Sequence, residues 1–234
     1  NNDLIDVVSI QKKKKITQFK NKEDDEPYQV WRIDVDNTKY VLKEAKEREK
    51  EIYQSILFKV KESVPTLYQI ITIDEKTYLL MEYIEGDDLC KCNRAKLKNV
   101  LDALISLQQK TWKIQEIDQC EYSFEKSQVQ RQNRGKYLND TLLEEAYEKF
   151  LRVFQSVPRT LCHDDLLPFN VISNNEKAVL IDWECGGILP YPTSFVRLIA
   201  HTEENENALF YMSKSDKCYA IDYYYENLLK KNGI

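Results

Sequence analysis

The pattern of hydrophobic and polar positions predicts an antiparallel sheet in the first third of the chain. Short runs rich in β-branched and aromatic residues are separated there by polar segments with strong turn chemistry. The five runs lie at 16–20, 28–35, 39–43, 67–73 and 77–83. We expect the first three to form a meander and the last two a hairpin that turns at 74–76.

The hydrophobic period changes between Glu44 and Lys61. Apolar residues recur there at spacings of three or four positions, which predicts an amphipathic helix. They are Ala45, Ile52, Ile56 and Val60. Glu49 lies on the same stripe, so its carboxylate is expected to face inward, and Pro65 follows the end of the helix.

Beyond Gly86–Asp88 the pattern is almost wholly helical. Helices are expected at 94–113, 121–137, 139–154, 193–211 and 215–230, with short strands at 159–162, 170–173 and 178–182. Because a glycine and two acids follow an apolar strand, we place a boundary there, between an N-terminal lobe at 1–84 and a helical C-terminal lobe at 85–234. The predicted fold class is α+β.

Glycine is scarce, with 5 in 234 residues, and the first is Gly86. The glycine-rich loops of Walker A, Rossmann and protein-kinase nucleotide sites each need several glycines where the backbone approaches phosphate. None of these loops can therefore lie in the N-terminal third.

Charge and cysteine usage narrow the class of protein further. The net charge of −5 argues against nucleic acid as the main partner, and no apolar run is long enough to span a membrane. The start of the sequence has no basic-then-apolar signal segment, so we expect a cytoplasmic protein with reduced cysteines. Cys90 and Cys92 lack a second cysteine pair or a histidine cluster, which disfavours zinc.

The segment 161–172, LCHDDLLPFNVI, carries the most informative chemistry. It contains H-x-D-x-x-x-x-N at His163, Asp165 and Asn170, and Asp182 follows an apolar run further on in VLIDWE. Phosphoryl transfer requires a carboxylate that orients the acceptor hydroxyl, together with an amide and a carboxylate that hold Mg²⁺ against the phosphates. Upstream, Lys43 ends a strand shortly before the inward-facing Glu49.

Taken in order, these motifs resemble the aminoglycoside phosphotransferase and choline kinase family of small-molecule kinases. The resemblance covers about residues 15–200 and includes the lysine strand, the glutamate helix, LLMEYIEG, HxDxxxxN and IDWE. It implies a two-lobed protein-kinase-like fold, with an antiparallel-sheet N-lobe and a mostly helical C-lobe. It also implies ATP and Mg²⁺ as cofactors.

The resemblance implies roles for the catalytic loop and the metal site. Asp165 would be the catalytic base, and Asn170 and Asp182 would be the magnesium ligands. His163 would be structural, packing the loop. Trp183 stands where protein kinases have the phenylalanine of D-F-G.

The same resemblance implies the nucleotide contacts. Lys43 would anchor the α and β phosphates, with Glu49 as its orienting partner. Backbone groups of Glu82 and Ile84 would hold the adenine edge.

The expected activity is ATP-dependent transfer of the γ-phosphate to a hydroxyl of a small molecule. The acceptor could be an aminoglycoside, choline or a related amino alcohol or sugar, and the sequence does not choose among them. The alternative is a catalytically impaired kinase-like protein that only binds nucleotide. A protein kinase is disfavoured, because too few residues follow Asp182 to build a peptide-binding lobe.

Three features depart from the family pattern. Asp164 beside Asp165 leaves the identity of the base ambiguous, although the spacing to Asn170 favours Asp165. Thr193 or Ser194 replaces the aspartate that steadies the catalytic loop in the family. The turn at 21–27 is acidic and would repel a triphosphate if it folded inward, so we expect a solvated hairpin tip there.

Overall fold

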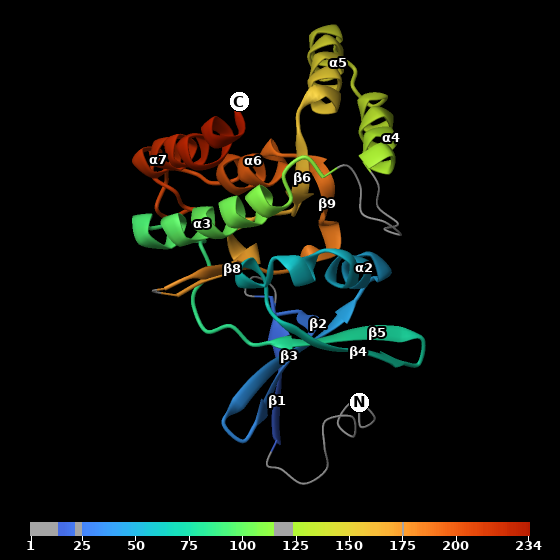
Figure 1. The fold of residues 1–234 in the computed structure, drawn as a ribbon, viewed down its shortest axis with the longest axis vertical. Coiled ribbons are helices and arrows are strands. Elements are labelled where there is room, and N and C mark those ends of the chain that lie inside the picture. Colours follow the sequence, from blue (N-terminus) through green and yellow to red (C-terminus); the bar gives the residue numbers. More distant parts are fainter. Residues whose placement is uncertain (1–13, 22–24, 115–123, 175) are drawn as a thin grey trace.

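The computed structural model describes residues 14–21, 25–114, 124–174 and 176–234. Its N-terminal part is one antiparallel sheet in the order β1-β2-β3-β5-β4 (Figure 1). The strands are β1 (Lys14–Lys20), β2 (Pro27–Val35), β3 (Thr38–Ala45), β4 (Leu67–Ile73) and β5 (Lys76–Glu82). All five agree with the sequence prediction to within a few residues.

Tight turns fix the register of the sheet. Val35 pairs with Thr38 across a two-residue turn, and Ile73 pairs with Lys76 across another. Asp74 and Glu75 in the second turn both have positive φ, at 49° and 64°. This geometry follows the right-handed twist of the flanking strands, so the hairpin closes without splaying.

Helix α2 (Glu47–Ser55) lies between the sheet and the rest of the molecule (Figure 1). The helix predicted over 44–61 is shorter than expected, because two 3₁₀ turns, Leu57–Lys59 and Lys61–Ser63, replace its last part. The apolar positions of the predicted stripe are still buried, except Ala45, which is partly buried against the same core. Ile52, Ile56 and Val60 join one core that also contains residues of β5 and of the C-terminal helices.

The C-terminal part is mostly helical. Its helices are α3 (Arg94–Lys110), α4 (Phe124–Gly135), α5 (Thr141–Ser156), α6 (Pro192–Ala200) and α7 (Lys214–Tyr224), the last continued by π-helical and 3₁₀ turns to Asn232. Short strands lie between them: β6 (Arg159–Cys162), β7 (Val171–Ser173), β8 (Ala178–Leu180) and β9 (Gly187–Pro190). Strand β9, which pairs with β6, was not predicted.

The helix predicted over 193–211 is wrong in its second half. Helix α6 ends at Ala200, and the Thr202 hydroxyl donates to the carbonyl of Ile199 just beyond it. The following segment pairs with itself and with the start of the C-terminal part, through bridges of Tyr211 to Glu203 and Lys91. The polar run at 203–207 has no apolar stripe to bury, so tertiary pairing determines its conformation.

Helices α4 and α5 form a hairpin that projects from the body of the molecule (Figure 1). Asp140 caps α5 by accepting a hydrogen bond from the Leu143 N–H, as its sequence position predicts. Phe154 at the base of the hairpin is buried, whereas Leu142 and Val153 stay exposed. The apolar face of α5 is therefore only partly covered.

The segment after β5 passes close to strand β7 in the C-terminal part of the chain. Asp87 and Ser173 exchange two backbone hydrogen bonds, with N···O distances of 2.9 and 2.8 Å. A side chain at Gly86 would place its Cβ 2.5 Å from the Ser173 carbonyl oxygen. Glycine is needed at this crossing because two backbones approach each other there.

We expect Gly86→Ala to lower the free energy of unfolding by about 1 to 3 kcal/mol, because the new methyl group forces the two segments apart. Urea denaturation measures the change. Gly233→Ala is the control for backbone conformation, since φ is positive at both glycines but a Cβ at Gly233 meets nothing within 4 Å. Equal effects of the two substitutions would contradict the proposed crowding.

Candidate active site

An ion pair joins the sheet to helix α2 at the centre of the candidate site. The Lys43 Nζ on β3 lies 2.8 Å from both carboxylate oxygens of Glu49 on α2. Glu49 is 1% exposed, so the helical period placed its carboxylate correctly. Its Oε1 also accepts the backbone N–H of Trp183 at 3.2 Å.

Lys43 also reaches the segment that follows β8. Its Nζ lies 2.6 Å from Oδ1 of Asp182, a residue 139 positions further along the chain. Asp182 adopts the left-handed conformation, with φ 64° and ψ 63°. Lys43 therefore holds two carboxylates from two different elements, one buried and one partly exposed.

Burial and charge shift the pKa values of Lys43 and Glu49 in opposite directions. Burial alone would lower the pKa of Lys43, but the attraction of Glu49 and Asp182 outweighs it, and the net pKa is raised. Burial raises the pKa of Glu49, and Lys43 offsets part of that rise. Each charge is thus stable in the interior only because the other is present.

Helix α2 is fastened to the loop after Asp182 by a second set of contacts. The Arg48 guanidinium donates to the carbonyl of Gly186 at 2.8 Å and to that of Cys185. Lys46 lies 3.0 Å from the carboxylate of Glu184. These bonds fix the distance between α2 and Asp182.

His163 anchors the predicted catalytic loop in the core. The residue is fully buried, and its Nε2–H donates to the Ile181 carbonyl at 2.6 Å. Its ring packs on that of Trp183, with the centroids 4.8 Å apart. The loop is therefore tied to the strand that leads into Asp182.

Asp165 and Asn170 stand at the two ends of the same loop. The Asn170 side-chain amide donates to the backbone carbonyl of Asp165 at 2.8 Å. This orientation leaves the Asn170 Oδ1 as the atom available to a cation, and oxygen is the ligand that Mg²⁺ prefers. The described residues contain no cluster of three or more His, Cys, Asp or Glu side chains that could hold a metal by themselves.

The two neighbouring aspartates have different surroundings. Asp164 has φ 56°, a conformation that aspartate adopts more readily than most residues. Its carboxylate lies 3.1 Å from Arg131 on α4. Burial raises the pKa of Asp164, although Arg131 and Arg48 lower it in part. Asp164 thus ties the α4–α5 hairpin to the loop, while the Asp165 side chain is directed to α6.

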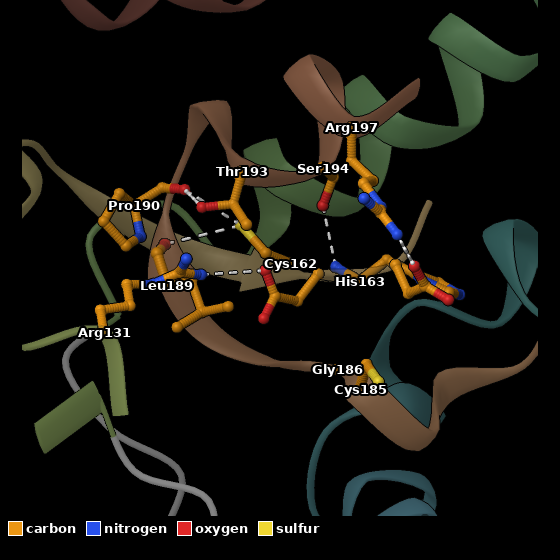
Figure 2. A network of polar contacts seen from close by, with 12 residues as sticks. Arg131, Cys162, His163, Cys185, Gly186, Leu189, Pro190, Thr193, Ser194 and Arg197 are labelled. Atoms are coloured by element: carbon orange, nitrogen blue, oxygen red, sulfur yellow. Dashed lines mark hydrogen bonds and ion pairs between the residues drawn. The ribbon is translucent and has the colours of Figure 1, made fainter. Parts of the chain in front are cut away.

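Helix α6 supplies two contacts that sequence reasoning did not assign. The Ser194 hydroxyl is fully buried and accepts the His163 N–H at 2.8 Å, as Figure 2 shows. Thr193 instead donates to the Pro190 carbonyl. Of the two candidates, Ser194 therefore occupies the place of the expected loop-steadying aspartate, and the loop keeps a bond from this helix.

Arg197 lies one turn further along α6 and points toward the loop (Figure 2). Its Nη2 and Nε donate to Oδ1 of Asp165 at 2.7 and 3.1 Å. The sequence offered one signal for this contact, the three-residue spacing between Ser194 and Arg197, which puts both side chains on one helix face.

The residues expected to hold adenine lie at the end of β5. The Glu82 N–H donates to the Thr66 carbonyl at 2.9 Å, so this N–H is already engaged within the protein. The described residues provide no acceptor for the backbone N–H of Ile84.

The acidic turn between β1 and β2 is described only at its edges. Asp25 is exposed and its carboxylate lies 2.6 Å from Lys20. Glu26 is exposed as well. Both agree with a solvated hairpin tip, while Glu23 and Asp24 lie outside the described residues.

Comparison with known proteins places the chain in a family. The sequence model of the phosphotransferase enzyme family matches residues 20–212. The chain belongs to this family. A search of curated proteins finds no significant match to the sequence.

Solved phosphotransferase structures share the fold. An aminoglycoside-3'-phosphotransferase of type VIII is 14% identical with a TM-score of 0.63, covering 96% of this chain and 91% of its own. The Plasmodium vivax ethanolamine kinase is 17% identical with a TM-score of 0.58, covering 97% and 69%. Aminoglycoside phosphotransferase APH(3'')-Id from Streptomyces rimosus, in complex with ADP and streptomycin, is 13% identical with a TM-score of 0.59, covering 85% and 82%.

These likenesses confirm the predicted fold class. This member of the phosphotransferase family is an α+β protein with a kinase-like arrangement of an antiparallel sheet and a mostly helical part. Within the described ranges, no helix has the length and apolar character needed to cross a membrane.

We expect Ser194→Ala to destabilise this phosphotransferase by about 1 to 3 kcal/mol, because the buried His163 N–H loses its acceptor. Chemical denaturation monitored by tryptophan fluorescence measures the loss. Ser156→Ala is the matched control, since that hydroxyl is exposed at the end of α5. Loss of the same size in both variants would contradict the role given to Ser194.

The buried His163 should make stability sensitive to pH. Burial lowers the pKa of His163 below its ordinary value of 6.5. As pH falls below 6.5, the unfolded chain takes up a proton that the folded protein does not, so the free energy of unfolding decreases down to the folded pKa. The wild type should therefore lose more stability than His163→Asn between about pH 7.5 and about pH 5.5. Denaturation curves at several pH values measure both slopes, and equal slopes would contradict this assignment.

Proposed function

We propose that this phosphotransferase is an ATP-dependent kinase that moves the γ-phosphate to a hydroxyl of a small molecule. The observation that carries the proposal is the Lys43 cluster, in which a strand lysine, a helix glutamate and the aspartate after β8 meet. Membership of the phosphotransferase family supports the reaction class. The nucleotide, the metal and the acceptor are the finer parts of the proposal.

Lys43 would bind the α and β phosphates of ATP, with Glu49 holding the lysine in place. The adenine edge would meet backbone groups of Glu82 and Ile84, where β5 ends. The likeness to the Streptomyces rimosus enzyme, solved with ADP, supports nucleotide binding.

Asn170 and Asp182 would hold Mg²⁺ through an amide and a carboxylate oxygen. When bound, the ion would neutralise charge on the phosphates. Their oxygen chemistry fits the ion, because magnesium is typically held by one or two carboxylates together with phosphates and water.

Asp165 would act as the base. The acceptor hydroxyl would give its proton to the Asp165 carboxylate while its oxygen forms a bond to the γ-phosphorus. The bond between that phosphorus and the oxygen bridging to the β-phosphate would break, leaving ADP. Positioning and charge stabilisation account for most of the rate in such transfers.

The acceptor class stays open among an aminoglycoside, choline and a related amino alcohol or sugar. The solved neighbours act on acceptors of more than one kind, and their low identity transfers none of them to this chain. The division into lobes at 1–84 and 85–234 and the cytoplasmic location are likewise predictions that we keep.

A protein that binds nucleotide without catalysis was the alternative, motivated by the missing loop-steadying aspartate and the acidic turn. The hydrogen bond that the His163 N–H donates to Ser194 replaces a contact expected from the missing aspartate. Asp25 and Glu26, at the edge of the acidic turn, are exposed, which weakens the argument that this turn repels the nucleotide. We therefore favour the active kinase.

The test measures ADP release from Mg-ATP with hygromycin B, streptomycin, ethanolamine and choline as probe acceptors. We expect turnover with at least one acceptor class and a loss of kcat of about 10² to 10⁴-fold in Asp165→Ala. Asp222→Ala is the control, because that carboxylate is exposed on α7. Activity that survives Asp165→Ala but is lost in Asp164→Asn would reassign the base.

Thermal shift separates the two functions. Mg-ATP should raise the melting temperature of the wild type, and Lys43→Met should abolish the shift, because binding to the native state stabilises it. A nucleotide-dependent shift without turnover for any acceptor would favour the binding protein. No shift at millimolar nucleotide would contradict the nucleotide site itself.

A further inference from the structure

One face of α6 presents two polar side chains, Ser194 and Arg197, to the catalytic loop. They are three residues apart, so they lie on one side of the helix, and His201 follows directly after its last residue, four positions beyond Arg197. Ser194 binds the backbone at the start of the loop, at His163. Arg197 binds the Asp165 side chain two residues further on.

The hydrogen bonds from Arg197 to Asp165 involve only one of the two carboxylate oxygens. Nη2 and Nε both donate to Oδ1, at 2.7 and 3.1 Å. The described residues make no hydrogen bond or ion pair to Oδ2 of Asp165. One carboxylate oxygen is thus held by the protein and the other is left for a ligand.

Arg197 is itself held from its far side. Its Nη1 donates to Nε2 of His201, which caps the C-terminal end of α6. The guanidinium is planar and rigid, so bonds at both ends fix its orientation and, through it, the orientation of the Asp165 carboxylate.

The location of the pair argues against a mainly structural role. The side chains of Arg197 and Asp165 are 34% and 35% exposed. Ion pairs with this much solvent contact contribute little to folding stability. The pair nevertheless includes Asp165, the proposed catalytic base.

We propose that Arg197 is a positioning residue that directs Oδ2 of Asp165 at the acceptor hydroxyl. The proposal rests on the function proposed above. In the transfer the acceptor proton moves to Oδ2, while Arg197 keeps its own protons and stays bonded to Oδ1. Arg197 binds neither phosphate nor acceptor.

Two other roles give different kinetics. If Arg197 bound an anionic group of the acceptor, its removal would raise the acceptor KM and leave kcat unchanged. If it masked Asp165, its removal would increase turnover. A positioning residue lowers kcat, because a misaligned base still lets both substrates bind.

The experiment compares Arg197→Gln, Arg197→Lys and His201→Ala with the wild type, using the probe acceptor that reacts in the panel above. Arg197→Gln should lower kcat about 10- to 100-fold with the KM values for ATP and acceptor unchanged. Arg197→Lys should recover part of the loss, because it keeps the charge without the forked geometry. His201→Ala should lose less than Arg197→Gln.

Arg152→Gln is the matched control, since Arg152 is 69% exposed on α5 and 3.7 Å from Glu148. It should keep wild-type kinetics. Unchanged kcat in Arg197→Gln, a rise in the acceptor KM alone, or a gain of activity would each overturn the proposal. If Arg197→Gln does not fold, the kcat and KM values of Arg197→Lys and His201→Ala decide by the same criteria.

A second measurement does not depend on turnover. In NMR spectra of the full chain, the Arg197 Nε–Hε signal should be resolved in the wild type and should move or exchange away in Asp165→Asn. A wild type without turnover or Mg-ATP hydrolysis would refute the proposed function, whereas an Arg197 signal indifferent to Asp165→Asn would refute the contact itself.

Discussion

The contacts of one largely buried lysine organise the candidate site. Lys43 lies between Glu49 and Asp182, and neither the lysine nor the buried glutamate could remain charged in the interior without the other. Because the three residues come from a strand, a helix and the segment after β8, their contact fixes how these elements meet. The loop contacts of Arg48 and the Trp183 N–H bond to Glu49 reinforce the same arrangement.

The catalytic loop is held in the same way, by polar groups that need partners inside the protein. The His163 ring donates to the carbonyl of Ile181, and its backbone N–H donates to the Ser194 hydroxyl. Asn170 closes the loop onto the Asp165 carbonyl. The Lys43 end and the Asp165 end of the candidate site are therefore joined through Ile181 and Asp182, and each constrains the position of the other.

The sequence predicted those features of the fold and the site that depend on the spacing of nearby residues along the chain. The period of α2 identified Glu49 as inward-facing, and turn residues located the strands that bring Lys43 to it. The choice of Ser194 over Thr193, and the contact of Arg197, depend on which face of α6 meets the loop, and sequence spacing alone does not determine that. The end of α6 at Ala200 was missed for the same reason, since the segment beyond it pairs with residues far away in the chain.

The core that runs through α2 has a consequence for how such a protein can be altered. Ile52, Ile56 and Val60 are buried together with residues of α3 and β8. Cutting the chain after the sheet and α2 would expose this apolar surface on both fragments, because each half completes the interior of the other. A chimaera that exchanges the sheet and α2 with those of a relative would therefore have to exchange the facing residues of α3 and β8 as well.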